Sequence, residues 1–400
     1  KKDKTVIITG SILLLYLSTA VLDSIHFRQA IPNSGDTATK STQYKAKVES
    51  VLDVMFGERS QATEKTYSSP FALHSYLKEV KAEGGQYFPK LKGIAAHIKN
   101  KSDRQTDVVL QLIYALLISA ITAGVLRFLF GEKRFFSIVV WSSLVFVLIV
   151  MVLLERHYHI LGTDKIGQDV FYQTIKSIRT GLVIGLITTL VTLPFAIILG
   201  LAAGYFGGRL DDLIQYIYIT ISSIPGVLLI AASVLSMQVF ISNHPEMFQS
   251  LMARSDARLI ALCVILGLTG WTSLCRVLRA ETLKLREIDY IQAAKVLGSR
   301  SSVILFKHIL PNVMHLILIA VVLDFSFLVL AEAVLSYIGV GVSPLTISWG
   351  NMINGARLEL AREPVVWWPM LAAFIFMFMF VLSTNLLADK VRDVFDPRAN

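Results

Sequence analysis

The sequence predicts an all-α protein that crosses a membrane several times, and two observations support this fold class. Hydrophobic residues make up 54% of the chain and charged residues only 17%, with a mean hydropathy of +0.60. Eight apolar runs are long enough to cross the roughly 30 Å hydrocarbon core of a bilayer. We therefore expect a polytopic membrane protein built from transmembrane helices.

The eight candidate spans are residues 5–22, 108–130, 136–154, 178–204, 213–241, 257–275, 316–339 and 367–388. The first is short, and the fifth is interrupted by Pro225-Gly226. Pro194 lies inside the fourth span, where neighbouring helices can satisfy the carbonyl that a proline leaves free.

Lysine and arginine counts in the short loops predict the orientation of these spans. The segments expected inside are 1–4, 131–135, 205–212, 276–315 and 389–400, and those expected outside are 155–177, 242–256 and 340–366. The inside segments carry more than twice as many lysines and arginines as the outside loops. Both termini are therefore expected in the cytoplasm. The net charge of +9 reflects this topology, and it does not indicate a nucleic-acid partner.

The first span, the N-terminal segment 1–22, has an alternative interpretation. Basic residues at its start, an apolar run and Ser18-Thr19-Ala20 resemble a signal peptide with its cleavage site. Cleavage would leave seven spans and would not change the orientation of the others.

Residues 23–107 form the one substantial soluble segment, expected to be a mostly helical extracytoplasmic insert. Apolar residues recur at helical spacing from Tyr44 to Met55, and Ser69-Pro70 is a typical helix start that Gly84-Gly85 would end. An extra span, 108–130, follows the insert. No catalytic motif occurs in the insert.

A polar stretch, residues 286–312, separates the sixth and seventh spans. Its pattern predicts two short helices joined at Gly298, the second ending at Pro311. Small residues at Ala293, Ala294 and Gly298 would let the surface of another protein approach the backbone. A solvated loop between membrane helices is the alternative.

These residues resemble the cytoplasmic coupling loop of ABC importer permeases. Gln292-Ala293-Ala294, Gly298 and Leu310-Pro311 fill the loop pattern, with Gln292 in place of the usual glutamate and His308 in place of isoleucine. A histidine there is usual in the peptide/nickel branch. Further segments resemble the family in order across residues 136–400: 161–164, 167–170 (with Gln168 for arginine), 204–208, 267–271, 335–339, 348–352, 385–389 and 396–398.

The resemblance implies a type I ABC importer permease fold, with a core of about six helices over residues 136–400. The first two spans and the insert have no counterpart in it. It also implies the partners: a homologous permease subunit in a heterodimer, two ATP-binding subunits and an extracytoplasmic solute-binding protein, assembled at a bacterial inner membrane. The chain contains no G-x-x-x-x-G-K-[ST] phosphate loop. We therefore expect no cofactor and no catalytic residue in this chain, and ATP and Mg²⁺ on the partner subunits.

The polar stretch supplies the expected ATPase-coupling residues: Tyr290, Gln292, Ala293, Ala294, Lys295, Val296, Gly298 and Arg300. A helix docked on an ATPase shifts an inward/outward equilibrium only by the difference in its contact energy between the two states. A shift from 1:99 to 99:1 takes about 5.5 kcal/mol. Contacts that total several kcal/mol are therefore enough.

Asp324 and Glu332 are the candidate residues of the translocation path. Both lie inside the seventh span, where a carboxylate costs roughly 2.5–3.5 kcal/mol and usually faces a cavity or a partner. Eight residues separate them, close enough to two turns to share a helix face. A carboxylate hydrogen-bonded to a neighbouring helix is the alternative.

No metal site is expected. Cys263 and Cys275 lie in or beside an apolar run, and His157 and His159 beside Glu155 fit the polar flank of a span. Two other classes remain open: an integral membrane enzyme, for which no catalytic pair is found, and a secondary transporter, for which no repeat is found. The transported solute is expected to be a peptide or peptide-like, with nickel chelates or another solute of the same branch as the alternative.

Overall fold

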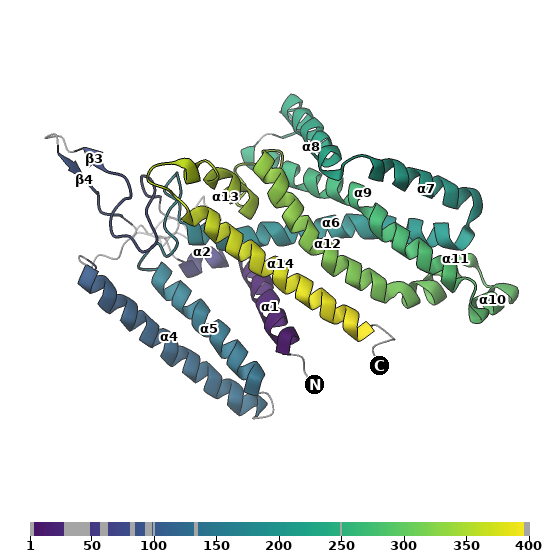
Figure 1. Cartoon of the computed structure of the whole chain (residues 1–400), viewed down its shortest axis with the longest axis horizontal. Helices are drawn as coiled ribbons and strands as arrows, with labels where there is room; N and C mark the ends of the chain where they lie inside the picture. Colours follow the sequence, from purple (N-terminus) through teal and green to yellow (C-terminus); the bar gives the residue numbers. More distant parts are fainter. Residues whose placement is uncertain are drawn as a thin grey trace, which may run out of the picture. The chain divides into compact units, whose positions relative to one another are not determined.

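The computed structural model describes residues 4–27, 49–56, 63–80, 85–92, 98, 101–131, 135–248 and 250–395. The backbone in these ranges is predominantly helical (Figure 1). The chain divides into two compact units, Lys1–Thr180 with Ile347–Phe380 and Gly181–Thr346 with Val381–Asn400.

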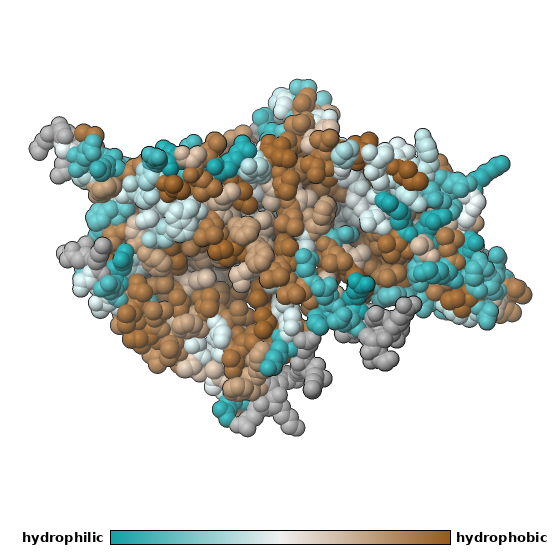
Figure 2. Space-filling view, in the orientation of Figure 1, coloured by the Kyte–Doolittle hydropathy of each residue, from teal (hydrophilic) through white to brown (hydrophobic). Residues whose placement is uncertain are grey.

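The first unit holds the N-terminal helices and the described part of the insert. Its elements are α1 (Lys4–Ser24), β1 (His26–Phe27), β2 (Glu49–Ser50), α2 (Val51–Phe56), β3 (Glu79–Val80), β4 (Gln86–Tyr87), α4 (Lys101–Phe130), α5 (Phe135–Glu155), the start of α6 (Val170–Phe206), α13 (Trp349–Ala356), the 3₁₀ turn η3 (Glu359–Ala361) and the start of α14 (Trp368–Phe395). Helices α4 and α5 pack side by side as a hairpin (Figure 1). Figure 2 shows apolar side chains covering both, as lipid contact requires.

The second unit is built from long helices. It contains the rest of α6, α7 (Gly208–Ser223), α8 (Gly226–Asn243), α9 (Leu251–Leu285), α10 (Asp289–Val296), α11 (Ser301–Val303), the π-helical segment η2 (Ile304–Ile309), α12 (Leu310–Ile338) and the end of α14. Ser250 caps α9 by accepting a hydrogen bond from Ala253 N at 3.0 Å. Gly339, with φ 89°, ends α12 in the left-handed conformation that glycine adopts without strain.

Within the described residues, eight helices are long and apolar enough to cross a membrane, as the sequence predicts. The predicted interruption of the fifth span at Pro225-Gly226 separates α7 from α8. Of the two, α8 is the helix that is long and apolar enough to cross a membrane. Pro194 lies inside α6 without ending it.

The insert is less helical than predicted in its described part. The expected helix after Ser69-Pro70 is wrong: residues 70–80 form turns and the short strand β3, which pairs with β4. Of the helix expected over 44–55, residues 44–48 lie outside the described residues, 49–50 form β2, and only α2 is helical. Tertiary contacts explain the difference, because Ser68 forms a bridge with Thr163 and Leu73 packs in a core with Tyr158.

Candidate functional site

Helix α10 is anchored on one side and exposed on the other. Ile291 is 1% exposed and packs in a core with side chains of α6, α7, α9 and α12, and Ala294 packs against the same core. On the opposite side Tyr290 is exposed, and Val296 and Leu297 are 86% and 84% exposed. The helix therefore holds apolar side chains in solvent, where a partner surface could bury them.

The chain turns back after α10 at Gly298. Its φ of 78° is in the left-handed region, and the turn is closed by hydrogen bonds from Gly298 N to Lys295 O and from Ser299 N to Ala294 O, both 3.1 Å. A Cβ at Gly298 would meet no atom within 4 Å. Ala293, Lys295 and Arg300 are exposed around this turn, and Figure 2 shows a hydrophilic surface at the α10 end of the second unit.

Two side-chain hydrogen bonds fix the orientation of α10. Gln292 Nε2 donates to Arg286 O at 2.7 Å, which ties the helix to the end of α9. Asn312 Nδ2 donates to the hydroxyl of Tyr290 at 2.9 Å, which ties it to α12. Gln292, predicted as a coupling residue, therefore acts within the loop, and Tyr290 combines an internal bond with an exposed ring.

Pro311 does not end a helix, contrary to the prediction. The residues from Ser301 to Ile338 form one continuous helical run, with a π-helical segment at Ile304–Ile309 and Pro311 in the first turn of α12. Within a continuous helical run a proline removes one backbone hydrogen bond, and its ring crowds the preceding turn. The wider π turn changes the hydrogen-bond pattern just before the proline.

An ion pair braces the helices beneath the loop. Arg279 on α9 donates to Asp211 on α7, with Nη2 and Oδ2 2.6 Å apart in a bidentate contact. The hydrogen bond from Arg279 lowers the pKa of Asp211 below its usual value. Sequence reasoning did not pair these residues, because 68 residues separate them.

Replacing Asp211 by asparagine is expected to lower the free energy of unfolding by about 1.5–3 kcal/mol at pH 7, the range for a hydrogen bond to a charged group. Because the folded-state pKa of Asp211 is depressed, this stabilisation is present above the unfolded pKa of about 3.9 and is lost as the pH falls through the folded pKa. Thermal unfolding in detergent at pH 7 and below pH 4 checks both. The exposed Asp212→Asn is the control, and an equal effect of the two variants would contradict the bracing role.

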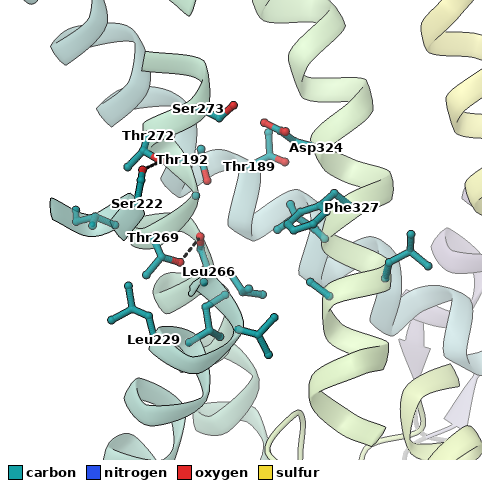
Figure 3. Close-up of a pocket in the computed structure, with 18 of the residues that line it drawn as sticks. Thr189, Thr192, Ser222, Leu229, Leu266, Thr269, Thr272, Ser273, Asp324 and Phe327 are labelled. Carbon is teal, nitrogen blue, oxygen red and sulfur yellow. Dashed lines mark hydrogen bonds between the residues drawn. The ribbon is translucent and has the colours of Figure 1, made fainter. Parts of the chain in front are cut away.

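A pocket of about 700 Å³ lies within the second unit, between α6, α7, α8, α9 and α12 (Figure 3). Its wall is largely apolar, with hydroxyl groups at Thr189, Thr192, Ser222, Thr269, Thr272 and Ser273. Asp324 is the only ionisable residue among those that line it. Figure 3 shows Asp324 and most of the hydroxyls toward one end, and Leu229 toward the other.

The two predicted path residues lie in different environments. Asp324 lines the pocket and is partly exposed. Glu332 does not line it: its side chain is buried and accepts a hydrogen bond from Ser336 Oγ at 2.7 Å. A role of Glu332 in a translocation path therefore stays a prediction.

Sequence reasoning missed two parts of this site. Leu297 and Val296 are the two most exposed apolar residues of the stretch 286–312. In the sequence, only its position next to the turn glycine marks Leu297. The hydroxyl residues of the pocket come from three different helices, and no local pattern connects them.

Comparisons with known proteins identify the family of the chain. Residues 196–400 match the family described as the binding-protein-dependent transport system inner membrane component. The oligopeptide transport system permease protein OppC of Bacillus subtilis (strain 168) is 31% identical over 60% of this chain and 72% of its own length. The dipeptide transport system permease protein DppC of Lactococcus lactis subsp. cremoris is 30% identical over 62% of this chain and 66% of its own length. The glutathione transport system permease protein GsiD of Pectobacterium atrosepticum is 32% identical over 60% of this chain and 73% of its own length. The predicted resemblance and fold class are confirmed, and this multi-pass chain belongs to the family of binding-protein-dependent transport system inner membrane components.

Proposed function

We propose that this chain is one permease subunit of an ATP-driven importer for peptides or peptide-like solutes. The observation that carries the proposal is α10, an immobilised polar helix that exposes Val296 and Leu297 at the end of the second unit. Three relatives named as oligopeptide, dipeptide and glutathione permeases support the choice of cargo over nickel chelates.

The partners that we propose are those that the family resemblance implies. Two ATP-binding subunits would carry ATP and Mg²⁺, and one of them would contact α10. A homologous permease would complete the path, and a solute-binding protein would deliver cargo. Affinity purification of the tagged chain expressed with these subunits tests the proposal. We expect ATP-binding subunits in the complex and ATP-dependent peptide uptake by proteoliposomes. A complex that transports solute without ATP would contradict it.

We further propose that the pocket forms part of the translocation path, with Asp324 attracting the amino group of a passing peptide. Replacing Asp324 by asparagine is expected to lower uptake of a lysine-containing peptide by about tenfold, the loss that roughly 1.4 kcal/mol of charge attraction would give. Uptake of an acidic peptide should fall less. The control is Asp256→Asn on α9, because Asp256 is exposed and does not line the pocket. Equal losses for both peptides would remove Asp324 from cargo selection.

The orientation we propose places both termini and α10 in the cytoplasm and the insert outside. The native cysteines, Cys263 and Cys275, are buried and give little background labelling. A Lys65→Cys variant, whose side chain is exposed, is expected to react with an impermeant maleimide in intact cells. Glu287→Cys, equally exposed but next to α10, should react only after the membrane is opened. The reverse pattern would invert the topology.

A further inference from the structure

A buried polar cluster in the first unit belongs neither to α10 nor to the pocket. Glu155 is the last residue of α5, His159 lies in the loop that follows, and Asp169 directly precedes α6. All three side chains are buried, Glu155 and His159 at 3% exposure and Asp169 at 0%. Each offers a ligand atom within 4.8 Å of those of the other two.

Asp169 orients the imidazole ring of His159. His159 Nδ1 and Asp169 Oδ2 are 2.5 Å apart, and the other carboxylate oxygen of Asp169 accepts a hydrogen bond from Tyr172 N at 2.8 Å. A carboxylate that accepts the Nδ1 proton leaves the lone pair of a histidine on Nε2, as in many metal sites. Nε2 of His159 is buried and has no hydrogen-bond partner among the described residues, and Glu64 Oε1 lies 3.7 Å from it.

Glu155 carries the strongest indication of a missing ligand. Both of its carboxylate oxygens are buried, and neither has a hydrogen-bond partner in the part of the chain that the structure describes. An ionised carboxylate in this position is strongly unfavourable without a compensating charge. Protonation would let Glu155 donate one hydrogen bond toward Asp169 but would leave its carbonyl oxygen buried. A cation bound within the cluster compensates the charge of the Glu155 carboxylate.

The backbone around the cluster is held in place by the insert. Glu64 N donates to Gly167 O at 2.8 Å, and a Cβ at Gly167 would collide with the backbone carbonyl of Glu64. Thr163 Oγ1 donates to Thr66 O at 3.0 Å. The loop between α5 and α6 is thus fixed against the insert, so the ligand atoms are already positioned before an ion binds.

We propose that Glu155, His159 and Asp169 form a binding site for one divalent transition-metal ion, with Zn²⁺ as the best fit. Glu155 and His159 are the donors, and Asp169 orients the imidazole through Nδ1. An imidazole with carboxylates suits Zn²⁺ or Mn²⁺, whereas Ca²⁺ and Mg²⁺ prefer oxygen ligands alone. The ion fastens the end of α5 to the loop that leads into α6. This proposal departs from the expectation that His159 has no metal role.

The first test is metal binding by the purified full-length chain in detergent. The protein is stripped with EDTA, incubated with Zn²⁺, Mn²⁺, Ca²⁺ or Mg²⁺ alone, desalted and analysed by inductively coupled plasma mass spectrometry. We expect about one Zn²⁺ per chain and a rise in the unfolding temperature with Zn²⁺ but not with Ca²⁺. Failure of the wild-type chain to retain Zn²⁺ would overturn the proposal, whatever the variants do.

Variants locate the ion. Glu155→Gln and His159→Gln are expected to lose the bound Zn²⁺ and the rise in unfolding temperature. His157→Gln is the matched control, because His157 lies two residues away and bonds to Asp107 at 2.9 Å, outside the cluster. Retention of Zn²⁺ by Glu155→Gln would place the ion elsewhere and overturn the assignment. If Glu155→Gln does not fold, the visible spectrum of the Co²⁺-loaded wild type decides: mixed nitrogen and oxygen coordination supports the site, and its absence contradicts it.

Discussion

Replacing Gly298 by valine is expected to lower ATP-driven uptake by at least about fivefold while the protein still folds and inserts. The φ of 78° at Gly298 is a region that β-branched residues avoid, at a cost of about 1–3 kcal/mol. The turn that closes α10 would then open, and Val296 and Leu297 would lose the fixed position that a partner requires. A cost of this size reduces the population of the competent loop by roughly fivefold to 150-fold.

A second substitution at the same position separates two causes. Asparagine tolerates the left-handed conformation but adds a side chain, and no atom of this chain lies within 4 Å of the added Cβ. If the backbone conformation is what matters, Gly298→Asn should retain most of the uptake that Gly298→Val loses. If close approach of an ATP-binding subunit is what matters, both variants should fail.

The control for backbone strain is Gly339→Val. Gly339 has a φ of 89° and also has open space around its Cβ, but it ends α12 far along the chain from α10. It should lower thermal stability without uncoupling ATP hydrolysis from uptake. Uptake and ATPase activity of the reconstituted complex are the measurements. Normal uptake by Gly298→Val would exclude the loop from the coupling mechanism.

The sequence predicted the membrane spans well because span formation depends on local hydropathy. Whether an apolar run spans the bilayer depends on its own length and composition, and only helix-breaking residues such as Pro225-Gly226 change the outcome. The position of the polar loop could be predicted for the same reason. Its inner contacts could not: that Ala294 faces the core and Leu297 faces solvent depends on helices distant in sequence.

The insert shows the opposite case. Its helical spacing after Ser69-Pro70 predicted a helix, but the segment pairs with the loop between α5 and α6 through Ser68 and Thr163. Tertiary contacts override weak local propensity in such short segments. Sequence analysis considered Glu155, His157 and His159 together but did not place Asp169 beside His159. His157 and His159 look like a pair, yet one bonds to Asp107 and the other to Asp169.

Replacing Gly200 and Gly204 together by leucine is expected to be the most destabilising change in the second unit. The two glycines lie four residues apart on α6, the spacing that allows close packing of membrane helices. A Cβ at Gly204 would come within 2.5 Å of Thr282 Cβ and 2.7 Å of Arg279 O. A Cβ at Gly200 would lie 2.9 Å from Cys275 O. Backbone carbonyls cannot move aside as flexible side chains do, so α6 and α9 must separate.

Overpacking of this kind costs about 1–3 kcal/mol at each site and occasionally more. We expect a sharply reduced membrane yield and a lower unfolding temperature in detergent. Gly124→Leu on α4 is the matched control, because no atom lies within 4 Å of its added Cβ. Equal stability of the double variant and this control would show that α6 and α9 are not closely packed. Because Arg286 at the end of α9 donates to Gly204 O at 3.3 Å, separation of the helices would also release the start of the α10 loop, and uptake should fall further than stability alone predicts.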